Sequence, residues 1–276
     1  MAITAADVNK LRTMTGVGMM DCKNALVEAD GDFDKAVDIL RKKGQKVAAK
    51  RADREANEGY VYSNKNNDNT FATIVMINCE SDFVGKNEEF VEFVKSVSKL
   101  SIDNKITSQE ELLKAKLNDL TVDEHLTQFT GKIGEKIEMP HYASIEANYV
   151  TNYNHNGNRL ASIVGFNKKT ENIEAVAHDL AMQIAAMNPV AITPEDVDQT
   201  FVQKELEIAR DLSRQEGKPE EMIERIAQGR LNKFYKENTL LNQEFIKDSK
   251  KTVEQYLNEA DKDLVCTTFK RLQLGS

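Results

Sequence analysis

The sequence predicts an α+β fold: a three-helix domain, a core of two related α+β subdomains, and an antiparallel helical hairpin inserted in the second subdomain. Three observations predict this arrangement. Helix signals fill residues 1–44. A β-hairpin followed by a helix occurs twice, with equivalent strand ends at Asn78 and Asn167, which indicates an internal duplication. Two long amphipathic segments flank a sharp Gly-Lys-Pro turn at 217–219.

The composition is that of a globular chain that can bury a core. Of the 276 residues, 30% are charged and 40% are hydrophobic. The 45 acidic and 37 basic residues give a net charge of −8, which argues against direct binding of nucleic acid driven by charge. Basic residues cluster between Arg41 and Arg54, a pattern typical of a solvated helix face or linker.

The cysteines and the N-terminus predict a cytoplasmic protein. Cys22, Cys79 and Cys266 lie far apart and are odd in number, so the pattern excludes a disulfide framework and indicates a reducing compartment. The stretch from Met1 to Asp7 has neither the basic region nor the apolar core of a signal peptide. Apolar runs stay well below the roughly 18 residues that a membrane span needs, so we expect no membrane contact.

The first 44 residues predict three short helices. Thr4 and Asp7 resemble a capping box at the start of the first, and we expect the third to end at Gly44. Met19 and Met20 are adjacent at the start of the second helix, so about one of them must point away from the core. Both are half-buried, or they form a flexible apolar patch for a partner.

The next elements predict the first α+β unit. Residues 45–58, rich in Ala, Lys and Arg, predict an exposed helical connector. A β-hairpin follows, with strands at 60–62 and 71–77 around a polar turn. Helices are expected over 88–100, 109–117 and 121–130, and the segment 131–137 leads into a new strand.

The turn from Asn78 to Asn87 contains an unusual aromatic residue. Ser81 or Asp82 is placed to cap the helix that follows. Phe83 is not needed for capping, yet it stands beside a carboxylate at the tip of the turn. One interpretation is that its ring folds back onto the core.

The second copy of the unit favours a functional role for this ring. Strands are expected over 147–151 and 160–167, and a helix over 173–186. At the corresponding turn, Lys168-Lys169-Thr170-Glu171 replaces Glu80-Ser81-Asp82-Phe83. Because the second copy has no equivalent ring, the unit does not need one to fold.

Residues 193–237 predict two antiparallel helices joined at 217–219. Thr193-Pro194-Glu195-Asp196 places proline at the first helical position. Each arm is roughly 30 Å long at 1.5 Å per residue and apolar on one face, so the pair is expected to project as a coiled-coil arm. The expected stripe of the first arm comprises Val197, Phe201, Ile208 and Leu212, and that of the second Met222, Ile223, Ile226, Leu231 and Phe234. Beyond the hairpin, we expect a helix over 252–258, a strand over 264–269 and a disordered end.

Motifs for catalysis or cofactor binding are missing from the sequence. The glycine patterns fail the P-loop and the dinucleotide fingerprint, and the four histidines show neither HExxH nor metal-ligand spacing. GxSxG is absent too. We therefore expect a binding protein rather than an enzyme, with no catalytic residues, metal or cofactor of its own.

Several motifs together carry a resemblance to a known family. Thr15-Gly16-Val17-Gly18-Met19-Met20-Asp21-Cys22-Lys23-Asn24-Ala25-Leu26 and Asn78-Cys79-Glu80-Ser81-Asp82-Phe83-Val84 look like the two signatures of the elongation factor Ts family, the guanine-nucleotide exchange factors of elongation factor Tu. Shorter matches run in the family's order, among them Lys132-Ile133-Gly134-Glu135, Tyr153-Asn154-His155 and Gly229-Arg230. Two departures are Ser81, where the family usually has Thr, and Gln183, where many members carry His.

The resemblance implies a division of the chain into domains. Residues 1–54 would form a ubiquitin-associated-like three-helix domain with a basic connector, and 55–140 the first core subdomain. The second would comprise 141–192 and 238–276, with the coiled-coil hairpin 193–237 inserted between them.

The resemblance also implies the partner and the site. Ser81, Asp82, Phe83 and Val84 would dislocate Mg²⁺ from elongation factor Tu, so that bound GDP leaves and GTP can enter during translation elongation. The three-helix domain would dock on the partner's GTPase domain and the second subdomain on another domain, giving a heterodimer. The expected partner-binding residues are Leu11, Arg12, Met19, Met20, His155 and Met182.

Two other functions are open at this point. The connector and the hairpin fit a scaffold protein that binds through those surfaces, in which Asp82 and Phe83 would matter little. The three-helix domain alone fits an adaptor for ubiquitin-like proteins.

Overall fold

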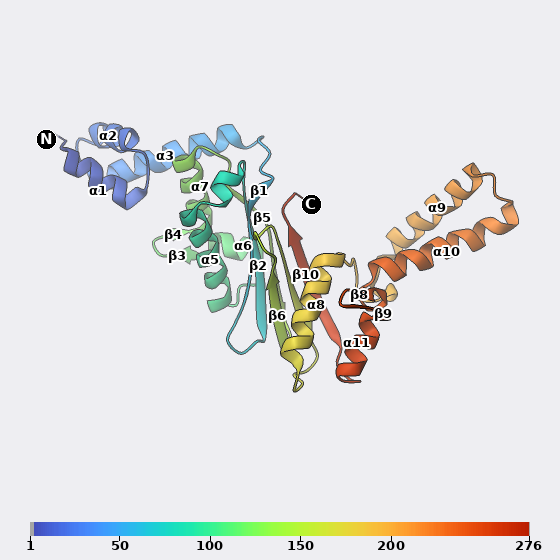
Figure 1. Cartoon of the computed structure of the whole chain (residues 1–276). Helices are drawn as coiled ribbons and strands as arrows, with labels where there is room; N and C mark the ends of the chain where they lie inside the picture. Colours follow the sequence, from blue (N-terminus) through green and yellow to red (C-terminus); the bar gives the residue numbers. More distant parts are fainter. Residues whose placement is uncertain (1–2, 276) are drawn as a thin grey trace.

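A computed structural model describes residues 3–275 and shows a mixed α+β fold (Figure 1). The N-terminal domain contains α1 (Ala5–Thr15), α2 (Met19–Glu28) and α3 (Phe33–Arg51) around a buried core that includes Leu11 and Leu26. Thr4 and Asp7 form the expected capping box. Residues 1–2 and 276, which belong to the first and last expected domains, lie outside the described residues.

The expected end of the third helix at Gly44 is wrong, because α3 continues to Arg51. Gly44 lies where α3 crosses α7 (Val122–Ile133), and the two backbones approach each other closely at Gly131. A Cβ atom added to Gly131 would lie 2.6 Å from the Cα of Gly44. A Cβ atom added to Gly44 would lie 3.3 Å from the carbonyl oxygen of Thr127, so both glycines permit the close crossing and Gly44 does not end the helix.

Two antiparallel three-stranded sheets form the centre of the protein. The first has the order β1 (Glu58–Lys65), β2 (Phe71–Cys79), β5 (Glu138–Glu146). The second has the order β6 (Tyr149–Asn154), β7 (Leu160–Phe166), β10 (Cys266–Gln273). The second strand of a hairpin is central in both sheets, as an internal duplication predicts. The expected domain boundary at residue 140 falls inside β5.

The two sheets pack face to face, and helices cover their outer sides (Figure 1). Ile74 of β2 and Ile163 of β7 lie in the apolar cluster between the sheets. The outer side of the first sheet packs against α5 (Glu88–Asp103), α6 (Gln109–Lys114) and α7, and that of the second against α8 (Ile173–Met187) and α11 (Val253–Ala260). Because both of its faces are covered, every residue of β2 is buried.

Short elements complete the core. The helix expected over 109–117 ends at Lys114, and a tight hairpin follows it. The remaining short elements are α4 (Asp82–Gly85), β3 (Lys116–Leu117), β4 (Leu120–Thr121), η1 (Pro194–Asp196), η2 (Leu240–Asn242), β8 (Glu244–Phe245) and β9 (Asp248–Thr252). None of the helices within 3–275 is long and apolar enough to cross a membrane.

The helices α9 (Gln199–Gln215) and α10 (Glu220–Asn238) pair side by side and extend away from the sheets (Figure 1). The expected start at Pro194 is only the short turn η1, and Asp198 caps α9. The expected stripe is displaced by about one position. Phe201, Ile208 and Leu212 are 40–43% exposed, and the buried row of α9 comprises Val202, Leu206, Ala209 and Ser213.

The expected disorder at the C-terminal end is wrong for the described residues. β10 reaches Gln273, and Leu274 is buried in the cluster between the two sheets. Its backbone N–H also donates to the carbonyl oxygen of Arg159.

Replacing Gly131 with alanine is expected to destabilise the protein by about 0.5–2 kcal/mol, because forcing an extra carbon into packed structure costs about 1–3 kcal/mol and the better helix propensity of alanine offsets roughly 0.5–1 kcal/mol of that. The added methyl group would push α7 away from α3 at their crossing. Thermal unfolding followed by circular dichroism measures the effect. Gly229→Ala is the matched control: it lies inside α10 with open space around it and should stabilise the protein by roughly 0.5–1 kcal/mol. Equal melting temperatures for Gly131→Ala and the unmodified protein would contradict the close crossing.

Candidate interaction site at the turn between β2 and α5

The turn between β2 and α5 contains an extra helical turn, α4. Asn87 caps α5, since its Oδ1 accepts hydrogen bonds from the backbone N–H groups of Glu89 and Phe90. The expectation that Ser81 or Asp82 caps this helix is therefore wrong. Ser81 stands at the N-cap of α4, but its side chain makes no capping bond there.

Phe83 projects into solvent from this turn and is 84% exposed. The interpretation that its ring folds back onto the core is wrong. Val84, the next residue, is half-buried and packs against the core under α5, and Gly85 lies directly against the backbone of Gly59 in β1. The base of α4 is thus fixed to the sheet while its tip presents a bare aromatic ring.

Asp82 is exposed beside this ring. Its carboxylate accepts a hydrogen bond from Nζ of Lys86 at 2.6 Å. This contact holds the pKa of Asp82 below its usual value, so the tip carries a negative charge near neutral pH. The tip therefore combines an apolar ring and a carboxylate on neighbouring residues.

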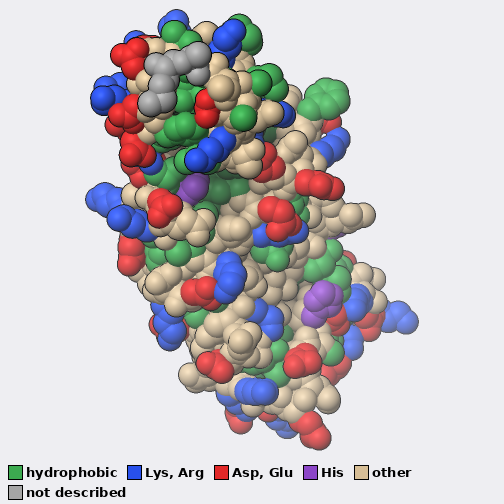
Figure 2. Space-filling model, turned by 90° about the vertical axis from the view of Figure 1, so that its left-hand side faces the viewer, with side chains coloured by type: hydrophobic (Ala, Val, Ile, Leu, Met, Phe, Trp, Pro, Cys, Tyr) green, Lys and Arg blue, Asp and Glu red, His purple; other side chains and the backbone are tan. Residues whose placement is uncertain are grey.

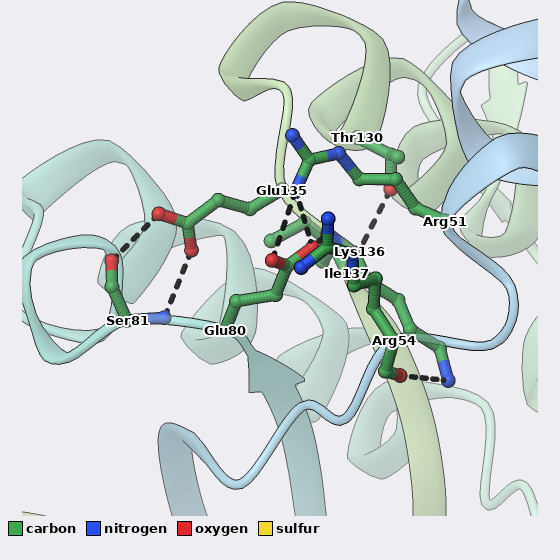
Figure 3. A network of polar contacts seen from close by, with 8 residues as sticks. All are labelled: Arg51, Arg54, Glu80, Ser81, Thr130, Glu135, Lys136 and Ile137. Atoms are coloured by element: carbon green, nitrogen blue, oxygen red, sulfur yellow. Dashed lines mark hydrogen bonds and ion pairs between the residues drawn. The ribbon is translucent and has the colours of Figure 1, made fainter.

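Two glutamates fix the turn, Glu135 from outside it and Glu80 from within it (Figure 3). Glu135 accepts hydrogen bonds from the backbone N–H of Ser81 at 2.9 Å and from its hydroxyl at 2.7 Å. Gly134 ends α7 in the left-handed conformation, with φ at 81°, and Glu135 follows it directly. The hydroxyl of Ser81 thus joins the turn to the end of α7.

Glu80 is held from two further sides. Nη1 of Arg51 lies 2.8 and 2.9 Å from its two carboxylate oxygens, and the backbone N–H of Lys136 donates to it at 2.7 Å (Figure 3). The hydrogen bond from Lys136 and the contact with Arg51 hold the pKa of Glu80 below its usual value. Sequence reasoning missed the roles of Arg51, Glu80 and Glu135. Its only signal was that Glu80 and Glu135 belong to motifs of the resemblance.

The expected docking residues of the N-terminal domain divide into buried and exposed ones. Leu11 is fully buried in the core of that domain, so its side chain is not exposed to a partner in this structure. Arg12 is exposed, and Met19 and Met20 are 52% and 66% exposed. Both methionines are therefore accessible to a partner, whereas the sequence predicted only that about one of them points away from the core. Hydrophobic side chains gather on this domain at the top of Figure 2.

The other two expected docking residues belong to the second sheet and its helix. His155 is exposed just after β6, and its Nδ1 lies 3.0 Å from the hydroxyl oxygen of Tyr153. Met182 is half-buried on α8. The structure thus distributes the expected site residues over the N-terminal domain, the β2–α5 turn and the second sheet with α8.

Gln183, the departure noted beside Met182, makes internal contacts. It is fully buried, and its Nε2 donates to Oε1 of Gln243 and to the carbonyl oxygen of Glu244, both at 3.1 Å. Its Oε1 accepts from the backbone N–H of Ile246 at 2.9 Å. This side chain therefore joins α8 to the segment 243–246.

Within residues 3–275, His, Cys, Asp and Glu side chains do not gather into groups of three or more that could hold a metal ion. The three cysteines are buried and unpaired. Burial raises the pKa of the Cys79 thiol to about 12, so this sulfur, although next to the turn, stays protonated and unreactive near neutral pH.

Comparison with known proteins points to one family. The family model described as elongation factor TS matches residues 80–276. The chain is 50% identical over 273 residues to elongation factor Ts of Flavobacterium psychrophilum and to that of Christiangramia forsetii, covering 99% of each chain in both cases. It is 51% identical over 277 residues to elongation factor Ts of Porphyromonas gingivalis, covering both chains fully.

Proposed function

Because the chain belongs to the elongation factor Ts family, we propose that its turn from Ser81 to Val84 drives the release of GDP from elongation factor Tu. Members of this family are translation elongation factors that act in protein biosynthesis as nucleotide exchange factors for elongation factor Tu. Exchange of this kind makes and breaks no covalent bond in the factor. The observation that carries the proposal is Phe83, exposed by 84% at the tip of a turn that is fixed at its base.

The mechanism acts on the partner's Mg²⁺ and phosphates. Mg²⁺ requires near-ideal octahedral coordination and bridges the phosphates of bound nucleotide. Phe83 enters between the partner's loops and displaces the groups that hold the ion, and the negative charge of Asp82 disturbs the polar contacts around it. Once the ion is displaced, the phosphates lose positive charge and GDP dissociates faster.

Exchange is a coupling between two binding equilibria. If this protein lowers the affinity of elongation factor Tu for nucleotide by a given ratio, bound nucleotide lowers the affinity of elongation factor Tu for this protein by the same ratio. GTP can therefore displace the factor after GDP has left. The protein needs no cofactor for this cycle, because release is driven by the difference between its affinities for the nucleotide-free and the nucleotide-bound partner.

Two further contacts keep the tip in register. Arg12, Met19 and Met20 dock on the GTPase domain of elongation factor Tu, and His155 and Met182 contact a second domain of the partner. Exposed methionines suit such a surface because their side chains adapt to the opposing shape. The result is a heterodimer with elongation factor Tu, formed in the cytoplasm where translation takes place.

Stopped-flow release of a fluorescent GDP from elongation factor Tu tests the proposal. Mixing the loaded partner with excess unlabelled GDP should give slow release, and adding this protein should accelerate release to a plateau as its concentration rises. The control is the same mixture with bovine serum albumin at equal concentration. Release at the rate of the control would contradict the proposed function.

A scaffold function is a second candidate, supported by the exposed row of Phe201, Ile208 and Leu212 on α9. Contiguous exposed apolar side chains on a helix commonly mark a binding surface. On that alternative, the protein would bind its partner through the α9–α10 hairpin and leave GDP release unchanged.

A further inference from the structure

The helix α3 belongs to two parts of the protein at once. Ala36 and Leu40 in its first half are buried in the core of the N-terminal domain, together with residues of α1 and α2. Its second half crosses α7 at Gly44. Its last residue, Arg51, reaches the turn that carries Phe83. An α-helix of 19 residues is about 28 Å long and nearly rigid, so α3 connects the docking surface to the tip through one stiff element.

The chain just after α3 is also fixed to the neighbourhood of the turn. Nζ of Lys136 donates to the carbonyl oxygen of Arg54 at 3.1 Å. Nδ2 of Asn78, at the end of β2, donates to the carbonyl oxygen of Ala56 at 2.7 Å. Lys136 also holds Glu80 through its backbone N–H. The end of α3, the end of β2 and the segment after α7 therefore meet at Glu80 (Figure 3).

The Arg51–Glu80 contact differs from the surface ion pairs of the protein. The side chains are 34% and 19% exposed, so water screens their attraction less than it does for pairs such as Lys114–Glu110, at 73% and 80%. Glu80 also directly precedes Ser81, so the contacts that hold its side chain restrain the chain at the start of α4. The pair is thus placed to fix the direction in which Asp82 and Phe83 point.

We propose that Arg51 and Glu80 are positioning residues for nucleotide release: their ion pair holds the turn of Phe83 at a fixed place relative to the docking surface on α1 and α2. This inference rests on the proposed function for its kinetic consequence. A partner bound by the N-terminal domain then meets the ring at one defined point. In enzymes, a misplacement of about 1 Å can lower a rate a hundredfold. A small displacement of Phe83 should therefore produce a measurable fall in the rate of GDP release.

The kinetic test separates docking from positioning. Arg51→Ala should lower the maximal rate of GDP release about tenfold, equivalent to 1.4 kcal/mol, and should leave the half-saturating concentration within about twofold of the unmodified protein. Arg51→Lys keeps the charge and should recover part of the rate. Lys50→Ala, which removes an equal charge from an exposed neighbour on the same helix, should change neither quantity. An unchanged maximal rate for Arg51→Ala would overturn the proposal.

A double-mutant cycle shows whether Arg51 acts through the ring. If it does, adding Arg51→Ala to Phe83→Ala should slow release by less than twofold, because displacing the turn has little effect once the ring that it positions is gone. A tenfold loss in both backgrounds would mean that Arg51 acts independently of Phe83, and the proposal would fail. Melting temperatures of all variants identify any that are unfolded, in which case the Arg51→Lys series replaces the alanine series.

Hydrogen exchange of the free protein tests the link without the partner. Amides between Ser81 and Asn87 should exchange several-fold faster in Arg51→Ala than in Lys50→Ala, because loss of the pair removes one of the restraints on the start of α4 and leaves those from Glu135 and the backbone N–H of Lys136. Equal exchange in the two variants would overturn the proposal. If the unmodified protein fails to accelerate GDP release, the proposed function fails, and the exchange rates still decide whether Arg51 holds the turn.

Discussion

Phe83→Ala is expected to lower the maximal rate of GDP release from elongation factor Tu by about 30-fold, the equivalent of the ~2 kcal/mol that marks an interface hot spot. The ring is 84% exposed, so it contributes little to the stability of the free protein. In the proposed mechanism, its apolar surface is buried only when it enters the partner, and that burial favours the state with displaced Mg²⁺. Stopped-flow release at saturating factor measures the loss.

Two further variants make this experiment specific. Phe83→Leu keeps an apolar side chain of smaller size and should give an intermediate rate. Phe201→Ala removes an exposed aromatic ring from α9 and should leave release unchanged if exchange acts through the turn. Both Phe83 variants should melt at the temperature of the unmodified protein, whereas Phe201→Ala loses a ring contact with Phe234 and should melt at a lower temperature. Full activity of Phe83→Ala, together with lost partner binding in Phe201→Ala, would favour the scaffold function instead.

The double variant Met19→Ala/Met20→Ala is expected to raise the half-saturating concentration of the factor by about tenfold or more, because burying one methionine contributes roughly 1.5–3 kcal/mol and each 1.4 kcal/mol is tenfold in affinity. Both side chains are more than half exposed at the start of α2. The maximal rate should stay the same, since Phe83 is untouched once the partner is bound. The concentration dependence of GDP release measures both quantities.

Met222→Ala is the matched control for the methionines, because this residue is 44% exposed on the hairpin, away from the N-terminal domain. It should leave the half-saturating concentration unchanged. A fall in maximal rate without a change in concentration dependence would show that the methionines act on exchange itself, contrary to a docking role.

The elements of the fold were largely predictable, whereas their contacts depended on tertiary structure. The apolar β-branched run at 71–77 predicted β2 because a strand covered on both faces needs such residues. Gly44 was misinterpreted because a glycine that ends a helix and one that permits a helix crossing look alike in sequence. The stripe of α9 was displaced for a related reason: Ala209 and Ser213 are buried because small side chains let α9 and α10 approach.

The same distinction holds at the site. The exposure of Phe83 was predictable because the second copy of the unit lacks a ring at the corresponding turn. The side chains that hold the turn were not, since Arg51 and Glu135 lie 29 and 54 residues away in sequence from the residues they bind. The periodicity of a single helix or strand cannot reveal residue pairs that lie so far apart in the sequence. Only the crossing of α3 with α7 and the turn at Gly134 bring them together.

The strand order of the second sheet has a consequence for how the chain folds during synthesis. The three strands of the first sheet are complete by residue 146, whereas β10 joins β7 only after the whole α9–α10 hairpin has been made. Until then, the inner face of the first sheet, which includes Ile74 and Ile145, lacks the finished second sheet as cover. Domains fold as their chain emerges, and uncovered apolar surface is prone to aggregate. The nascent chain is therefore most vulnerable while the hairpin is being translated, and the arrival of β10 ends that interval.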